Sequence, residues 1–411
     1  IIRLDAAMTL TKKHFQRLWY PEPGSGGAIP SRSERGLNRR QFNKQIPKEF
    51  WREVVDRVNA ETPDTLLLAE AFWLLEGYFV RNLGMHRVYN SAFMNMLKTE
   101  DNANYRKLIK NTLEFNPEIL RRHVNFMSNP DEAPAAAQFG RGDKYFGVAL
   151  MMATMPGLPM FGHGQFEGYS EKYGMEYRRS YHGENPDENL VRRHEREIFP
   201  VLRKRRLFAG ADSFLLYDFY DPNGAVNENV FAYSNRWGGE KALVVYNNKY
   251  EAAQGWINTA APRNKQGVLV RQNVDQGLEL SERNGAFYGF RDLKTGLRYL
   301  RTGKEIREKG LYVRLDGYQF HVFTDFYELH DNADSDLAKL CQHLNGRGVP
   351  DLDEAQQEMK HAAVISALRA LINPEAIQAL LRQPDPDLFF LQVSKIFSAV
   401  KKYTGATADI V

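Results

Sequence analysis

Three carboxylates in the first third of the chain have the residue types and surroundings that acid–base chemistry needs. Asp5 ends the apolar run that starts at Ile1, and Glu70 ends the run Leu66–Ala69. Asp131 follows a more mixed segment, residues 122–128, with Asn129 and Pro130 between them. One carboxylate that attacks carbon and a second that donates a proton are the pair required to cleave a glycosidic bond with retention of configuration. The spacing therefore directs attention to glycoside chemistry.

The neighbours of two of these acids suit different roles. Side chains alternate along a strand, so Arg3 and Asp5 share one face, where a guanidinium favours the ionised carboxylate that a nucleophile needs. Glu70 lies between Leu66–Ala69 and Phe72, and partial desolvation there would raise its pKa towards the range of a general acid. The alternative interpretations are a strand-end ion pair for Asp5, an exposed glutamate for Glu70 and a turn or capping acid for Asp131.

Four short motifs resemble those of the α-amylase family, glycoside hydrolase family 13. Arg3-Leu4-Asp5-Ala6, Ala69-Glu70-Ala71-Phe72 and Asn129-Pro130-Asp131 follow the order of that family's nucleophile, acid/base and third-acid motifs. Residues 155–165, Met-Pro-Gly-Leu-Pro-Met-Phe-Gly-His-Gly-Gln, resemble its last barrel strand. Each motif is weak alone, but four in order, separated by helix-length segments, make the resemblance specific. It covers roughly residues 1–330.

The resemblance implies a retaining glycoside hydrolase that acts on α-linked glucans such as maltodextrin, starch or glycogen. Asp5 would form the covalent glycosyl–enzyme intermediate, Glu70 would be the acid and base, and Asp131 would bind sugar hydroxyls and assist ring distortion. Two alternatives remain open: an α-glucan transglycosylase, and a non-catalytic glucan-binding or regulatory protein with a relic site. Pro130 stands where the family usually has histidine, which removes one hydroxyl contact.

Further residues are expected to bind the oligosaccharide or polysaccharide substrate. Arg3 and Asn129 belong to the motifs themselves, and His163 ends the last barrel strand. Phe72 and Trp73 follow Glu70 and could stack on sugar faces, as could Tyr89. Packing in the core is the alternative for each of these aromatic rings.

The elements that must position these residues are those of a partial (β/α)8 TIM barrel, an α/β fold. Asp5 would close barrel strand four, and strands five to eight are expected within 65–72, 85–89, 122–128 and 158–163. Residues 20–47 are predicted to be one long loop beside the substrate, because long βα loops carry the sites of such barrels. We expect three regions: the carboxyl-terminal part of the barrel (1–208), an antiparallel β-sandwich (209–330) and a helical region of unknown role (331–411).

The family's third-strand motif, which contributes to sugar binding and often to a calcium site, is absent. We therefore predict no metal or other cofactor on this chain, and a calcium site only in an amino-terminal part that the chain lacks. With three strands missing, the chain by itself is expected to be inactive.

Composition narrows the class of protein. The 55 basic and 51 acidic residues leave a net charge of +4, which gives no sign of a nucleic-acid partner. Arg121-Arg122 and Arg203–Arg206 are interpreted as solvated helix faces. A single cysteine, Cys341, excludes an internal disulfide. No run approaches the roughly 20 apolar residues of a membrane span, so we expect no membrane contact and favour a soluble, cytoplasmic protein, with its oligomeric state left open.

Overall fold

The computed structural model describes residues 1–25, 29–71, 75–172, 179–281, 283–332, 336–383 and 385–406. The chain divides into two compact units. The first combines Ile1–Leu280 with Glu305–Asp325, and the second combines Ser281–Lys304 with Phe326–Val411. The boundaries of these units differ from the boundaries at 208 and 330 that the sequence suggests. The division into three regions stays a prediction.

The first unit opens with a five-stranded parallel sheet whose strands lie side by side in chain order. Its strands are β1 (Ile2–Leu4), β2 (Leu67–Ala69), β3 (Arg87–Tyr89), β4 (His123–Phe126) and β5 (Leu158–Met160). The register pairs Arg3 with Leu68 and Val88 with His123. Parallel neighbours require crossover connections, and each pair of strands here is joined by helices. The four predicted segments at 65–72, 85–89, 122–128 and 158–163 each contain one strand, so the expected α/β arrangement is confirmed at this level.

Helices fill the connections of the parallel sheet. They are η1 (Ala7–Leu10), α1 (Lys12–Trp19), η2 (Pro30–Arg35), α2 (Arg39–Gln45), α3 (Phe50–Glu61), α4 (Glu76–Arg81), α5 (Ser91–Thr99), α6 (Asn102–Phe115), α7 (Glu118–Arg122), α8 (Ala135–Phe139), α9 (Asp143–Thr154), α10 (Glu188–Glu197), α11 (Phe199–Arg203) and α12 (Arg205–Ala209). Helix α3 is amphipathic and buries Trp51 and Val55. Helix α9 is buried from Tyr145 to Thr154, because nearly every residue of its sequence is apolar and it can be covered on all sides.

Two predictions about this region need correction. Residues 20–47 are not one structureless loop, since they contain η2 and also α2, which begins at a capping box between Asn38 and Gln41. The basic cluster Arg203–Arg206 is not a solvated face throughout. The guanidinium of Arg205 donates to the backbone carbonyls of Ala153, Met155 and Gly157, so this arginine holds the end of α9 to the start of β5.

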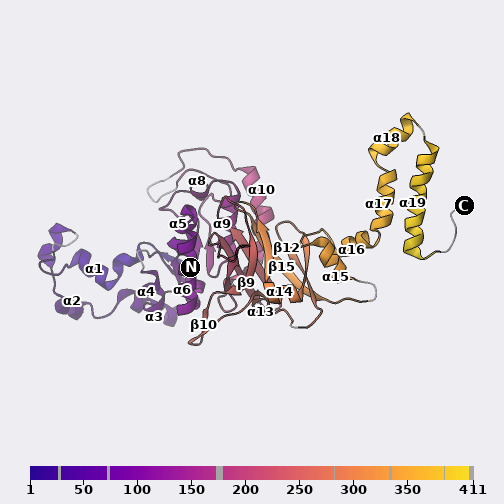
Figure 1. The fold of residues 1–411 in the computed structure, drawn as a ribbon. Coiled ribbons are helices and arrows are strands. Elements are labelled where there is room, and N and C mark those ends of the chain that lie inside the picture. Colours follow the sequence, from indigo (N-terminus) through magenta and orange to yellow (C-terminus); the bar gives the residue numbers. More distant parts are fainter. Residues whose placement is uncertain are drawn as a thin grey trace. The chain divides into compact units, whose positions relative to one another are not determined.

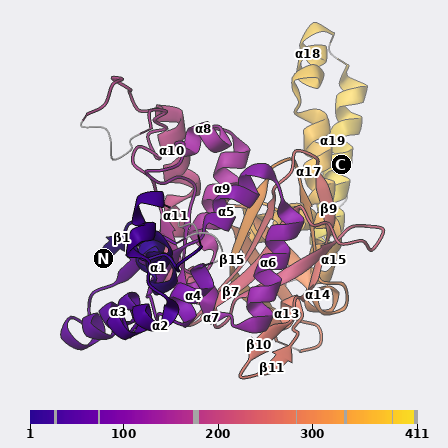
Figure 2. The ribbon, with the colours of Figure 1, turned by 90° about the vertical axis from the view of Figure 1, so that its left-hand side faces the viewer.

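Antiparallel strands follow in the same unit, and the last of them, β15, continues past the end of that unit at Asp325. Their order within one sheet is β15–β8–β7–β6–β9–β14. The bounds are β6 (Leu215–Tyr220), β7 (Val230–Trp237), β8 (Glu240–Asn247), β9 (Ala253–Ala260), β14 (Leu311–Leu315) and β15 (Phe320–Leu329), with a separate hairpin of β10 (Arg263–Lys265) and β11 (Val268–Val270) and the short helix α13 (Val274–Gly277). The fully buried Arg106 of α6 donates to Asp218 and Glu228, both at 2.6 Å. This network fixes α6 against the sheet (Figure 2).

Within its described residues, the second unit contains the hairpin of β12 (Phe287–Asp292) and β13 (Arg298–Thr302), and five helices. The helix α14 (Gly303–Lys309) runs across the boundary between the units, and the five helices are α15 (Leu337–Leu344), α16 (Leu352–Lys360), α17 (Ala362–Leu371), α18 (Pro374–Arg382) and α19 (Pro386–Thr404). Cys341 lies half-buried on α15 and packs with the buried leucines there. Helices α17 and α19 lie side by side in Figures 1 and 2, joined through α18.

The prediction that no segment is long and apolar enough to span a membrane needs correction. Residues Ala362–Arg382 are long and apolar enough to cross a membrane by length and composition, and none of that stretch is buried. The helix is interrupted within it, because Asn373 caps α18 and Pro374 begins it. A single such stretch is weak evidence, so localisation and the absence of membrane contact stay predictions.

Candidate active site

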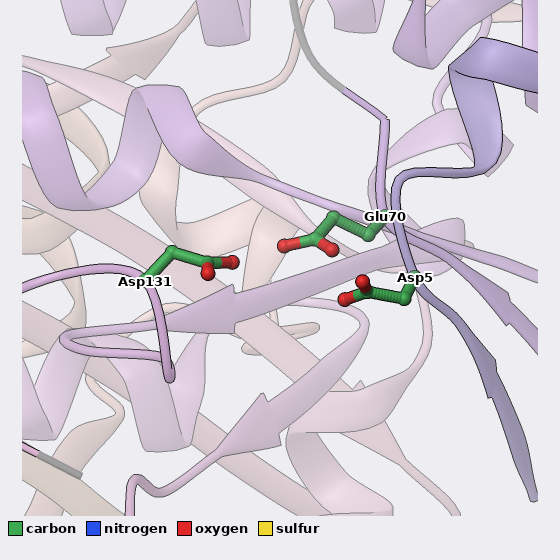
Figure 3. A group of neighbouring side chains, drawn as sticks. All are labelled: Asp5, Glu70 and Asp131. Atoms are coloured by element: carbon green, nitrogen blue, oxygen red, sulfur yellow. The ribbon is translucent and has the colours of Figure 1, made fainter. Parts of the chain in front are cut away.

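The three carboxylates singled out by the sequence converge at one end of the parallel sheet (Figure 3). Asp5 follows β1, Glu70 follows β2, and Asp131 lies on the loop after β4. One carboxylate oxygen from each lies within 4.8 Å of the others. The carboxyl ends of parallel strands form one edge, which is why residues 126 positions apart in the chain can meet there.

Arg3 connects these acids. Its guanidinium lies 2.7 Å from Asp5 Oδ1, 2.9 Å from Glu70 Oε2 and 4.0 Å from Asp131 Oδ2. The guanidinium is oriented by its own Nε, which donates to the Tyr89 hydroxyl at 2.7 Å. One positive charge thus offsets part of the negative charge of three acids. The shared face of Arg3 and Asp5, predicted from strand alternation, is confirmed by this ion pair.

Glu70 differs from the other two acids in its burial. Its side chain is 3% exposed, whereas those of Asp5 and Asp131 are 48% and 61% exposed. Burial is the largest influence on its pKa, the backbone N–H of Ala6 and Arg3 oppose it, and the nearby carboxyls of Asp5 and Asp131 reinforce it. The pKa of Glu70 is raised to about 7 as a result. A carboxyl with this pKa is partly protonated at neutral pH and can donate a proton.

The two oxygens of Glu70 have different surroundings. Oε2 accepts from Arg3 at 2.9 Å and from the backbone N–H of Ala6 at 3.1 Å. Ala6 adopts a left-handed conformation with φ of 42°, and this turn directs its N–H towards Glu70. Oε1 is buried and has no hydrogen-bond partner among the described residues. Oε1 is therefore the atom left to carry a proton.

Asp131 is held by its own loop. The buried Asn129 accepts hydrogen bonds through Oδ1 from the backbone N–H groups of Asp131 and Glu132, both at 2.9 Å. Lys172, on the segment after β5, donates to the Asp131 carbonyl at 2.7 Å. The Asn129 side-chain nitrogen is buried and lacks a partner within the described part of the chain. Asn129 thus positions Asp131 and retains one free donor.

The other residues predicted to bind substrate have mixed outcomes. Phe72 and Trp73 lie outside the described residues, so their role stays a prediction. His163 follows β5 on an exposed turn, with its ring centroid 6.4 Å from that of Tyr169, and its role in sugar binding stays a prediction. The prediction that Tyr89 stacks on a sugar is wrong, because Tyr89 is only 1% exposed and its hydroxyl accepts a hydrogen bond from Arg3.

A cavity of about 380 Å³ lies among the segments that follow β1 and β2. Its lining includes His14 and Arg17 of α1, Glu49, and Tyr78 of α4. Tyr78 donates to Glu49 at 3.2 Å, and Glu49 also accepts from the backbone N–H of Lys12 at 2.8 Å. No motif in the sequence points to these residues. Their signal was the unusual length of the 20–47 connection, which carries the chain out and back to Glu49.

The same three acids form the one group of His, Cys, Asp or Glu side chains in the described part of the chain that could hold a metal ion. Arg3 already contributes a cation within 2.9 Å of two of them. A second cation at this position would meet like-charge repulsion, so the donor set fits an arginine-neutralised acid cluster better than a metal centre.

No family model and no curated protein sequence matches this chain. Solved structures to which it is similar include a debranching enzyme of Nostoc punctiforme soaked with acarbose, at 16% identity and a TM-score of 0.47, covering 67% of this chain and 54% of that one. An α-amylase of Anoxybacillus is 14% identical with a TM-score of 0.45, covering 69% and 56%. An α-amylase of Geobacillus thermoleovorans complexed with acarbose is 13% identical with a TM-score of 0.45, covering 69% and 57%.

These solved structures are of the kind that the sequence motifs indicate. The chain spans little more than half the length of each. At such identities and TM-scores the likeness carries no argument about activity. The function proposed below therefore rests on the carboxylates and their surroundings.

Proposed function

We propose that this chain carries the acid–base site of a retaining glycoside hydrolase of the α-amylase type, which acts on α-linked glucans. The observation that supports this most strongly is the pairing of an exposed, arginine-bound Asp5 with a buried Glu70 whose pKa is raised to about 7. A buried carboxyl that can hold a proton, beside an exposed carboxyl bound by a guanidinium, is the arrangement expected of a glycosidase's acid and nucleophile. The five parallel strands would then be strands four to eight of an eight-stranded barrel.

In the first step, an Asp5 oxygen bonds to the anomeric carbon while the bond from that carbon to the leaving oxygen breaks. Glu70 gives its proton, carried on Oε1, to the leaving oxygen. In the second step, Glu70 accepts a proton from water as the water oxygen attacks the same carbon and releases Asp5 as a carboxylate. Asp131, which lies 4.0 Å from Arg3, would bind sugar hydroxyls as the positive charge develops on the ring.

The distance between the acids supports retention. Retaining enzymes keep their two carboxyl groups about 5–5.5 Å apart, whereas inverting enzymes leave about 6.5–9.5 Å for a water molecule. One oxygen of Asp5 and one of Glu70 lie within 4.8 Å of each other, and this close approach favours the shorter, retaining spacing. Transfer to a second sugar would use the same covalent intermediate, so the acceptor, water or sugar, distinguishes hydrolysis from transglycosylation.

The test compares Asp5→Asn and Glu70→Gln in a protein whose barrel is completed to eight strands. Each variant should lose about 10²–10⁴-fold in maltodextrin cleavage, the usual contribution of a positioned acid or base. Asp56→Asn is a matched control, because Asp56 is an exposed acid on α3 that pairs with Arg52. Near-parental cleavage by both site variants would reject the assignment.

A further inference from the structure

A second cavity lies at the opposite end of the parallel sheet from the carboxylates. It has a volume of about 380 Å³ and is lined by residues at the amino ends of β2, β3 and β4, among them Leu66, Arg87 and Arg122. Strand β2 runs from this cavity to Glu70, and four residues of extended chain span about 13 Å. This amino-end cavity is therefore separate from the site described above.

The cavity is strongly basic. Arg87, Arg121 and Arg122 line it, and Asp64 is the acid on its lining. His86 also lines it, but burial and the neighbouring Arg122 and Arg87 lower the pKa of His86, so the positive charge comes from the arginines. Arg121 is paired with Glu118 at 3.0 Å, which leaves Arg87 and Arg122 facing one carboxylate. Burial lowers the pKa of Arg87, and Arg122 and Arg121 lower it further. The like charges lie close enough to destabilise one another, and an anion would relieve that repulsion.

Hydrogen-bond donors in the cavity are left free. Arg87 uses Nη1 to donate to the carbonyl of its neighbour His86, at 2.9 Å, and Arg122 uses Nη1 to donate to the Met85 carbonyl at 3.0 Å. Arg87 Nε also has no partner among the described residues, but it is closed to solvent, so the donors available to a ligand are the terminal nitrogens. These two bonds fix both guanidinium groups in place while leaving further N–H groups of each unused. Fixed, unsatisfied guanidinium donors match the oxygens of a phosphate or sulfate group.

We propose that the amino-end cavity binds a phosphate-type oxyanion, held between the guanidinium groups of Arg87 and Arg122. The anion is either free phosphate or the phosphate group of a sugar ester, since both present the same oxygens. The cavity lies at the strand ends and is open to solvent, so a small anion can reach it. Binding there requires none of the catalytic carboxylates and is independent of the proposed glycosidase activity.

The test is a calorimetric titration of the full 411-residue chain with inorganic phosphate, and separately with glucose 6-phosphate, at constant ionic strength. Arg122→Gln and Arg87→Gln should each weaken binding by about tenfold or more, because a hydrogen bond to a charged group has that effect. Arg57→Gln is the matched control. Arg57 lies on α3, is 75% exposed and pairs with Glu61, so the same change of charge there should leave binding unaltered.

The two ligands distinguish the sources of the anion. Tighter binding of glucose 6-phosphate indicates a sugar ester, and equal binding indicates free phosphate. Arg122 is only half-buried, so Arg122→Gln gives a result even if Arg87→Gln fails to fold. Absence of saturable binding of both ligands to the parent chain, or equal affinity in the parent and Arg122→Gln, would overturn the proposal. Glu70→Gln should bind phosphate as the parent does.

Discussion

The guanidinium of Arg3 lies 2.9 Å from the carboxylate of Glu70, and the pKa of Glu70 is nevertheless raised to about 7. An adjacent cation normally lowers the pKa of a carboxyl group. Here burial of Glu70 and the proximity of Asp5 and Asp131 outweigh the cation. Arg3 therefore shares its charge among three acids. It lies closest to Asp5, at 2.7 Å, and Glu70 can still hold a proton.

The raised pKa of Glu70 predicts a pH-dependent loss of stability. A carboxyl with a folded-state pKa near 7 and an unfolded value of 4.5 contributes its full stability below pH 4.5 and loses it as the pH rises through 7. Glu70→Gln cannot ionise and should escape that loss. The free energy of unfolding of Glu70→Gln relative to the parent should therefore rise between pH 4.5 and 7, by about 1–3 kcal/mol.

Urea unfolding at several pH values measures this difference on the isolated chain. Glu114→Gln, at an exposed position of α6, is the control and should show no such rise. A relative stability of Glu70→Gln that stays flat, or that falls with increasing pH, would show that Glu70 is not held in a proton-binding environment.

Removal of Arg3 should raise the pKa of Glu70 further. Arg3 is one of the two groups that lower it, so Arg3→Leu is expected to shift the Glu70 pKa upward by about one unit. Tyr89→Phe is the matched variant, because it removes the 2.7 Å hydrogen bond that orients Arg3 and keeps the charge of Arg3. Carbon-13 NMR titration of labelled glutamate side chains would follow both. An unchanged or lower pKa in Arg3→Leu contradicts the arrangement.

The Asn129 side chain should stabilise the loop that positions Asp131. Asn129→Ala removes the acceptor of two backbone N–H groups and should cost about 1–2 kcal/mol of stability, as the loss of a capping side chain does. Asn129→Ser keeps a side-chain oxygen and should recover part of that loss. Thermal unfolding of the two variants measures the difference. Equal stability of Asn129→Ala and the parent would show that the Asn129 side chain does not stabilise the Asp131 loop.

The five-stranded sheet predicts that the chain alone does not turn over substrate. Strands β1 and β5 each pair with one neighbour within the described sheet, whereas a closed barrel of this type needs eight strands. Asp5 follows β1 and so lies at an open edge, and catalysis tolerates only about 0.5 Å of misplacement. Maltodextrin hydrolysis by the 411-residue chain should be absent and should appear when a closed barrel is restored. Equal turnover by both would contradict the barrel interpretation.

The sequence predicted the strand ends well because short apolar runs followed by an acid mark them directly. The ordered motifs and their resemblance to the α-amylase family singled out Asp5, Glu70 and Asp131 together, and in the structure one oxygen of each lies within 4.8 Å of the others. The sequence could not show that Tyr89 orients Arg3, because a hydrogen bond between residues 86 positions apart depends on tertiary packing. The prediction for Arg205 was wrong for the same reason. The sequence shows a basic cluster, but only the tertiary structure shows that Arg205 donates to the backbone carbonyls between α9 and β5.

The most direct test of the central claim is the identity of the residue that becomes covalently linked to sugar. A protein with a completed barrel would be incubated with a fluorinated α-glucosyl fluoride that slows release of the intermediate, then digested and analysed by mass spectrometry. We predict one glucosyl adduct, on the peptide that contains Asp5, and its loss in Asp5→Asn. Turnover without any adduct, or an adduct on Glu70 or Asp131, would contradict the assignment of Asp5 as the nucleophile.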